Sequence, residues 1–157
     1  MSEEIKGYFL AEKVFWSKSN IHYALFFTSK RSVAAKVGGQ LKDFLGPVAM
    51  EEYARKAEAL KEVSIESILK ADKDNFEIPY TDITHIEVKK AGWKDKLITE
   101  MRTIGTMTIK GKEEHKFQIT RAFIVDPSSP TGLKPQKLED CIKVIRSVLS
   151  DKLSAEV

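Results

Sequence analysis

The run Ile21-His22-Tyr23-Ala24-Leu25-Phe26-Phe27-Thr28 decides how this chain can fold. It is aromatic or apolar at almost every position, so a strand built from it must be covered on both faces. Turn-forming residues stand on either side of it, Ser17-Lys18-Ser19-Asn20 before and Ser29-Lys30-Arg31 after. The run is therefore predicted to be a well-covered strand that is joined by tight turns to a strand on each side.

The two flanking segments have the pattern of strands. Residues 8–16 carry apolar side chains at alternate positions, which is typical of a strand with one buried face; these are Tyr8, Leu10, Val14 and Trp16. Residues 32–37 predict a short third strand, which stops at Gly38-Gly39. The first third of the chain is thus expected to form an antiparallel meander.

A helical insert is expected over about residues 40–71, where the apolar spacing changes to three and four. The pattern indicates a short helix around residues 41–45, a longer one that begins near Pro47, and a further helical turn over 64–70. The longer helix carries an apolar stripe that must be covered by something, formed by Met50, Tyr53, Ala54, Ala57 and Leu60. We expect it to cover the sheet; the alternative is that Met50, Tyr53, Ala57 and Leu60 face a partner or a second copy.

Strand periodicity returns after the insert and predicts four more strands. They are centred on residues 76–80, on 86–88, in the stretch 97–110 and on 117–119. The turn Lys110-Gly111-Lys112 joins the last two, and side chains that face the same side across this hairpin are expected to be Met107, Ile109, Phe117 and Ile119. The predicted sheet therefore has seven strands.

The C-terminal part is predicted to be a loop followed by an amphipathic helix. The loop, residues 126–132, is rich in proline and serine. The helix covers about 136–152, and its apolar stripe consists of Leu138, Cys141, Ile142, Ile145, Val148 and Leu149. Cys141 lies on this stripe and is expected to be a small buried hydrophobe rather than a nucleophile, and only the last few residues are expected to fray.

Two stretches resemble bacterial and archaeal members of the pleckstrin-homology-like (PH-like) superfamily. Phe26-Phe27-Thr28-Ser29-Lys30-Arg31 is similar to their second strand and turn, and Asn75-Phe76-Glu77-Ile78-Pro79-Tyr80-Thr81-Asp82-Ile83 to their fourth strand. The order of the predicted elements also resembles that family. The resemblance covers most of the chain and implies an α+β fold: a single domain over residues 1–157 with a seven-stranded antiparallel barrel-like sheet, a helical insert after the third strand and a C-terminal capping helix.

Composition limits the classes of function. The 26 basic and 23 acidic residues give a net charge of +3, which makes nucleic acid an unlikely partner. The single cysteine is compatible with a reducing compartment, and neither a secretory signal nor a long apolar segment is present, so a cytoplasmic location is expected. No cofactor is expected.

The most distinctive polar segment is the loop 89–96, with four lysines around one tryptophan. Its candidate anion-binding residues are Lys89, Lys90, Trp93, Lys94 and Lys96. Lysines attract anionic headgroups, and an aromatic ring can lie at the headgroup level, so the loop could hold an anionic membrane surface. The alternative is an ordinary solvated loop whose tryptophan packs on the sheet. A phosphoinositide site of the kind that eukaryotic PH-like domains use is not expected, because the first hairpin, residues 17–20, has one lysine only.

No catalytic residue and no metal ligand is predicted. Asp82 and His85 could suggest an acid and base pair, but no nucleophile or ligand cluster is evidently placed beside them. His22 and His115 stand alone on their predicted strands. We therefore expect a non-enzymatic binding or scaffolding domain that acts through an unknown protein partner or through self-association, with peripheral binding to anionic membrane lipids through residues 89–96 as the alternative.

Overall fold

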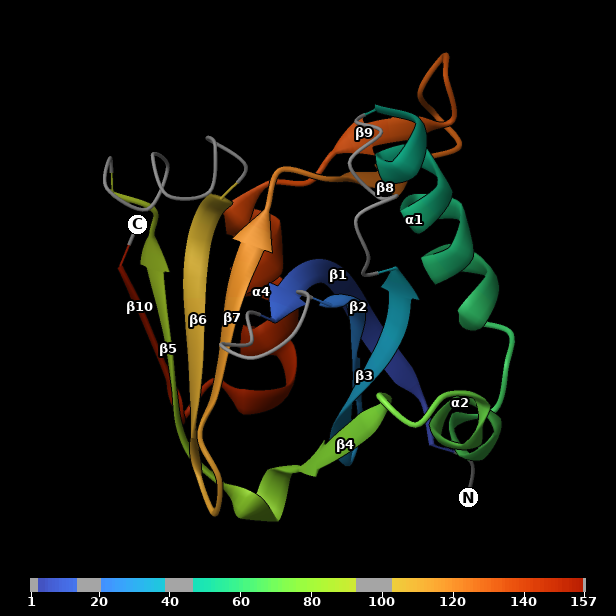
Figure 1. Cartoon of the computed structure of the whole chain (residues 1–157). Helices are drawn as coiled ribbons and strands as arrows, with labels where there is room; N and C mark the ends of the chain where they lie inside the picture. The colour runs from blue at the N-terminus through green and yellow to red at the C-terminus, as the bar shows by residue number, and fades with distance from the viewer. Residues whose placement is uncertain (1–2, 14–20, 39–46, 93–102, 157) are drawn as a thin grey trace.

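The structure, a computed structural model, describes residues 3–13, 21–38, 47–92 and 103–156 of the chain. Two halves of one strongly bent sheet face each other, with one helix between them at the back and two more on the outside (Figure 1). In chain order the elements are β1 (Ile5–Lys13), β2 (Ile21–Thr28), β3 (Arg31–Gly38), α1 (Pro47–Leu60), α2 (Ile65–Ala71), β4 (Phe76–Pro79), η2 (Tyr80–Asp82), β5 (Ile83–Lys90), β6 (Thr103–Gly111), β7 (His115–Thr120), β8 (Phe123–Val125), β9 (Leu133–Pro135), α4 (Leu138–Leu149) and β10 (Leu153–Glu156).

The sheet has eight strands in the order β10-β5-β6-β7-β1-β2-β3-β4. All neighbours are antiparallel except β10, which runs parallel to β5. The prediction of a seven-stranded antiparallel barrel-like sheet is therefore wrong in strand number and direction, and β4 and β10 end the sheet without pairing to each other, so no closed barrel forms. The α+β class, the insert after the third strand and the C-terminal helix are confirmed.

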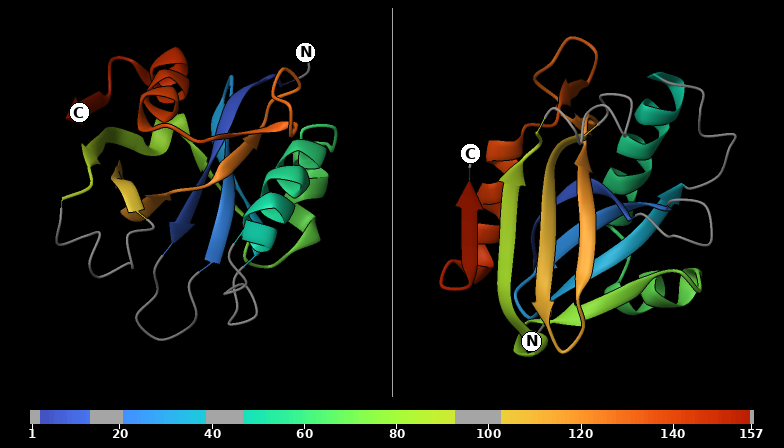
Figure 2. Two further views of the ribbon diagram at one scale, coloured as in Figure 1. Left: turned by 90° about the horizontal axis from the view of Figure 1, so that it is seen from above. Right: turned by 60° about the vertical axis from the view of Figure 1, so that its left-hand side comes forward.

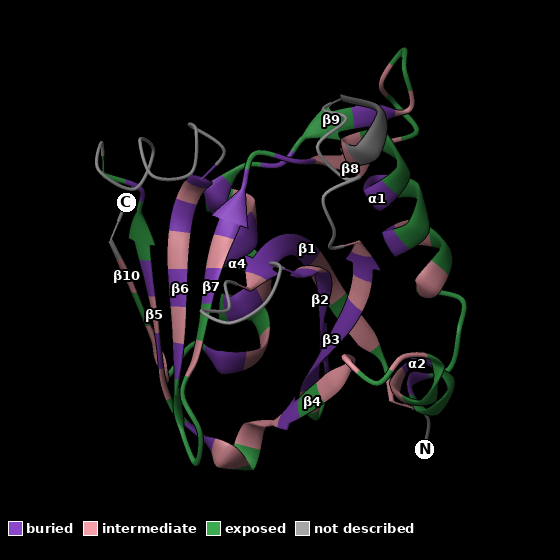
Figure 3. Ribbon diagram, in the orientation of Figure 1, coloured by how far each residue is buried: buried purple, intermediate pink, exposed green. Residues whose placement is uncertain are grey.

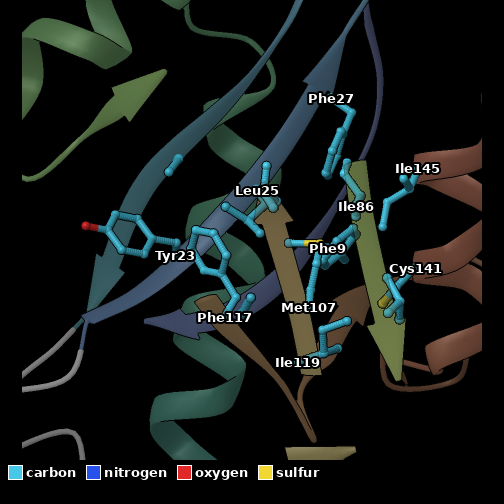
Figure 4. Packing of buried hydrophobic residues seen from close by; sticks show 14 of the residues in the cluster. Phe9, Tyr23, Leu25, Phe27, Ile86, Met107, Phe117, Ile119, Cys141 and Ile145 are labelled. Atoms are coloured by element: carbon cyan, nitrogen blue, oxygen red, sulfur yellow. The ribbon is translucent and has the colours of Figure 1, made fainter. Parts of the chain in front are cut away.

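The strands β1 to β3 are buried on both faces, which separates two hydrophobic cores (Figure 3). Along β2, Tyr23, Leu25 and Phe27 enter the main core between the two halves of the sheet, and Ala24 and Phe26 enter the second core under α1 and α2. Figure 4 shows the main core, where Tyr23, Leu25 and Phe27 lie opposite Met107, Phe117 and Ile119. The two-faced burial expected of residues 21–28 is confirmed.

The same layering corrects the prediction for the first strand. The alternation predicts a single buried face that carries Tyr8 and Leu10, but these two residues pack in the second core, and Phe9 and Ala11 on the other face enter the main core. The alternation fails as a guide here because both faces of β1 are covered. The later hairpin behaves as predicted: Met107 pairs with Phe117, and both are buried in the main core.

The helices cover opposite sides of the β1–β3 layer, as the turned views show (Figure 2). On α1, Tyr53 and Ala57 are buried in the second core, and Met50 and Leu60 pack against it, so the expectation that this stripe covers the sheet is confirmed. On α4, the stripe predicted for the last helix packs in the main core, with Cys141 1% exposed. Burial raises the pKa of the Cys141 thiol, which keeps it inert.

The two ends of α4 hold features that periodicity did not predict. The helix, Leu138–Leu149, is shorter than the expected range 136–152; residues 133–135 before it pair with β8, and residues 153–156 after it pair with β5. The last residues were expected to fray, but Leu153 and Ala155 pack against the main core. The short helix expected at 41–45 lies outside the described residues.

Gln136 fixes the segment between β9 and α4 to the sheet. It is 6% exposed; its side-chain oxygen accepts from Leu10 N at 2.7 Å, and its amide nitrogen donates to Leu10 O at 2.8 Å and to Thr120 O at 3.1 Å. One buried side chain thus forms three hydrogen bonds to buried backbone groups of β1 and β7, and buried groups of this kind need a partner.

We expect Gln136→Leu to lower the free energy of unfolding by about 2–4 kcal/mol, because it leaves buried polar groups unsatisfied. Urea unfolding followed by circular dichroism measures this change. The control Lys134→Ala alters an exposed side chain of the same segment and should change stability by less than about 0.5 kcal/mol. Equal effects of the two substitutions would show that these hydrogen bonds contribute nothing particular.

Candidate functional site

A cavity of about 270 Å³ lies where β4 approaches the β6–β7 hairpin without pairing to it. Both elements meet at one end of the molecule, at the lower end in Figure 1. The apolar part of the lining is formed by Ile78, Pro79 and Ile109, and the polar part by Glu77, Asp82, Lys112, Glu113 and His115. We call this the mouth cavity.

Backbone contacts hold the corner η2 in place beside the hairpin. Lys112 N donates to Asp82 O at 2.9 Å, and a Cβ added at Gly111 would lie 1.8 Å from that same oxygen. The hairpin can therefore approach only because residue 111 is glycine. From the turn before β10, Lys152 Nζ donates to Tyr80 O at 3.0 Å and to Ile83 O at 2.8 Å. The position of Asp82 is thus set by both the hairpin and this turn.

The imidazole of His115 forms one wall of the cavity. It stacks on Phe76 with ring centroids 5.3 Å apart, and its Nδ1 lies 3.1 Å from Lys13 Nζ. The Lys13 ammonium also lies 4.6 Å above the Phe76 ring. These contacts link β1, β4 and β7 at a point where β4 has no backbone bond to either other strand.

The protonation state of His115 follows from these neighbours. Burial, and to a lesser extent the Lys13 ammonium, lower the pKa of His115, while Glu113 partly opposes this change. An ammonium can only donate, so Nδ1 must accept, and the proton of the neutral ring lies on Nε2, 3.6 Å from a Glu113 oxygen. His115 is therefore neutral at pH 7.

The carboxylates of the lining differ in their partners. Glu77 forms an ion pair with Arg31, which also binds Glu3 at 3.0 Å and Glu66 at 2.9 Å. Glu113 is 77% exposed in its side chain. The lining carries three carboxylates against the single ammonium of Lys112, so it favours a positively charged group.

The lining determines which groups the cavity can bring together. Asp82 lines it, but His85 does not, so the pair suggested by the sequence is not brought together there. In the described part of the chain no group of three or more His, Cys, Asp or Glu side chains could hold a metal ion. At about 270 Å³ the cavity lies just below the range typical of cofactor sites, and it matches a single side chain better.

The other predicted residues lie elsewhere. Lys89 and Lys90 are exposed at the end of β5, where Lys89 pairs with Glu87 at 3.0 Å, and Trp93, Lys94 and Lys96 lie outside the described residues. The stripe of Met50, Tyr53, Ala57 and Leu60 contacts the chain's own sheet. His22 stacks on Tyr53, with ring centroids 5.0 Å apart.

Sequence reasoning missed the mouth cavity. Its lining comes from β4, η2 and the β6–β7 hairpin, which are separated by about thirty residues of chain, and no short motif joins them. A local signal existed in Glu113 and His115, an acid and a histidine beside the predicted turn at 110–112, but nothing in the sequence placed them next to Asp82. No helix in the described ranges is long and apolar enough to cross a membrane.

Comparisons with known proteins do not assign this chain to a family. No family model and no curated protein matches the sequence. Among solved structures, the hSac2 domain from human phosphoinositide phosphatase Sac2 is similar with a TM-score of 0.45 and 10% sequence identity, over 99% of this chain and 76% of that one. A similarity of this size carries no inference about ligand or activity.

We expect His115 to make stability depend on pH. Its pKa is lower in the folded chain than the value of about 6.5 in the unfolded chain, so the unfolded state binds the proton first as the pH falls. The stabilisation is present above pH ~6.5 and is lost as the pH falls below that value. In urea unfolding at pH 7.5 and 5.5, the wild type should lose more stability than His115→Gln. Equal losses would contradict the lowered pKa.

Proposed function

We propose that this chain is a non-enzymatic binding domain of the PH-like type that holds an extended, basic segment of a partner protein at the mouth cavity. The PH-like assignment is supported by the order of the elements. A meander of β1 to β3 is followed by the helical insert and β4, then by the meander of β5 to β7, and α4 packs between the two halves of the sheet.

The observation that carries the proposal is the position of the cavity at a free sheet edge. Among the strands that the structure describes, β4 pairs with β3 only, and its residues Glu77, Ile78 and Pro79 line the cavity. An unpaired edge offers backbone donors and acceptors to an added strand, and neighbouring pockets then select its side chains. Pro79 has no N–H to offer, which confines such pairing to a short segment.

The charge of the cavity lining determines which kind of partner segment can bind there. Asp82 and Glu113 face the cavity, whereas the carboxylate of Glu77 is already engaged by Arg31. A lysine or arginine side chain that enters between Asp82 and Glu113 would form charge-assisted hydrogen bonds, with its aliphatic stem against Ile78 and Ile109. A basic residue in an extended segment matches both the edge and the cavity.

The surface of the described residues favours a polar partner site over self-association through an apolar face. Val63, at 38%, is the exposed large hydrophobic side chain of that surface. The apolar stripe of α1, which could have served a second copy, is already covered by the sheet. Stable homodimer interfaces are rich in buried apolar surface, which this part of the molecule does not offer.

A matched pair of peptides tests the proposal. One is a capped pentapeptide that alternates threonine and valine around a central arginine, and the other has glutamate at the centre. We expect the arginine peptide to bind at least about fivefold more tightly, a difference of ~1 kcal/mol, and to shift the amide NMR signals of residues 77–82 and 109–115. Neutralising the site with Asp82→Asn and Glu113→Gln should abolish that preference.

The control is Glu62→Gln, which removes one exposed carboxylate between α1 and α2, outside the cavity lining. It should leave the affinity for the arginine peptide unchanged. The proposal would be contradicted if both peptides bound with equal affinity. It would also be contradicted if the site variant and the control lost equal affinity for the arginine peptide.

A second proposal is retained for the basic loop, because Lys89 and Lys90 are both exposed where β5 leads into it. On this proposal the chain attaches to anionic membranes through Lys89, Lys90, Trp93, Lys94 and Lys96. Sedimentation with vesicles that contain phosphatidylserine should then fall steeply with salt and fall further in Lys94→Glu. Binding that is absent in low salt, or indifferent to Lys94→Glu, would rule this proposal out.

A further inference from the structure

We propose that His115 is a protonation switch for the mouth cavity. When neutral, it accepts a hydrogen bond from Lys13 and leaves the acidic lining to an incoming basic side chain. When protonated, it releases Lys13 and interacts with the cavity carboxylates itself, so that the basic segment is held less tightly. The inference has two halves. The binding half, in which protonation weakens binding of the basic segment, rests on the proposed function. The protonation half, in which only neutral His115 can accept from Lys13, concerns the protein without ligand.

The contact between Lys13 and His115 is compatible with one protonation state only. The two nitrogens are 3.1 Å apart, and the ammonium of Lys13 must be the donor. A proton added to Nδ1 would place two N–H donors and two positive charges at this distance. The contact would then break, and one of the two side chains would have to move.

The charged groups at the imidazole have opposite effects on its protonation: Lys13 of β1 opposes it, and Glu113 of the β6–β7 turn favours it. Lys112 of the same turn, Glu77 of β4 and Asp82 of η2 line the cavity with it, and the Phe76 ring is stacked on its face. Glu77 is bound to Arg31, so Glu113 and Asp82 are the carboxylates that an imidazolium can approach. These are the same two carboxylates that the proposed basic side chain requires.

Competition for two carboxylates makes the coupling reciprocal. If protonation of His115 weakens binding of a basic segment, then that segment must make His115 harder to protonate by the same factor. The prediction therefore has two independent readouts, the affinity as a function of pH and the titration of His115 with and without ligand.

The first experiment uses the chain without ligand, and its tautomer readout is made on the wild type, so that readout does not depend on any variant that fails to fold. The imidazole ¹⁵N signals of His115 should show the proton on Nε2 at pH 7.5. In Lys13→Met the midpoint of the His115 titration should move to higher pH, because the ammonium no longer opposes protonation. A proton on Nδ1, or an unchanged midpoint in Lys13→Met, would overturn the switch.

The second experiment measures binding of the arginine pentapeptide between pH 7.5 and 5.5. We expect the wild type to lose affinity by roughly fivefold or more, within the usual size of coupling between sites, and the peptide to shift the His115 titration to lower pH. His115→Gln, whose side-chain oxygen can still accept from Lys13 but cannot be protonated, should lose less than about twofold.

The outcomes separate the two proposals. Arginine-peptide binding with the same pH dependence in the wild type and His115→Gln would overturn the switch and leave the proposed function standing. No preference for the arginine peptide at any pH would overturn the proposed function and, with it, the binding half of the switch. The free-protein titration would then decide the protonation half by itself.

Discussion

The burial of β2 on both faces is the constraint on which the rest of the structure depends. Tyr23, Leu25 and Phe27 need one apolar layer, and Ala24 and Phe26 need another. The second half of the sheet and α4 supply the first layer, and the helical insert supplies the second. Because apolar burial is the dominant favourable contribution to folding, this single run places the helices on opposite sides of the β1–β3 layer.

The mouth cavity is a consequence of that arrangement. β4 follows the insert and pairs with β3, whereas the β6–β7 hairpin belongs to the other half of the sheet. The two halves meet at this point without a hydrogen-bonded ladder, so polar side chains and the rings of Phe76 and His115 fill the junction. A junction that is held by side chains alone can rearrange on protonation or ligand binding more easily than two strands joined by a continuous ladder of backbone hydrogen bonds.

A few polar side chains connect parts of the chain that are distant in sequence. Gln136 joins the segment before α4 to β1, Arg31 joins β3 to Glu3 and to Glu66 of α2, and Lys152 joins the turn before β10 to the corner at η2. Each places a donor or acceptor where the sheet bends or ends and backbone pairing is incomplete. The periodicity of the sequence cannot predict such residues, because their roles depend on contacts with segments that are distant along the chain.

The sequence by itself determined the elements whose patterns are local: the apolar run at 21–28, the hairpin that pairs Met107 with Phe117, the helix that begins at Pro47, and the stripe on the last helix. Periods of two and of three to four report which residues share a face, and that property needs no distant contact. Only the tertiary structure decided which layer each face meets, that the sheet stays open, that residues 153–156 add a parallel strand, and that Asp82, Glu113 and His115 share one cavity. These features arise from contacts between segments far apart in the chain, and no local spacing encodes them.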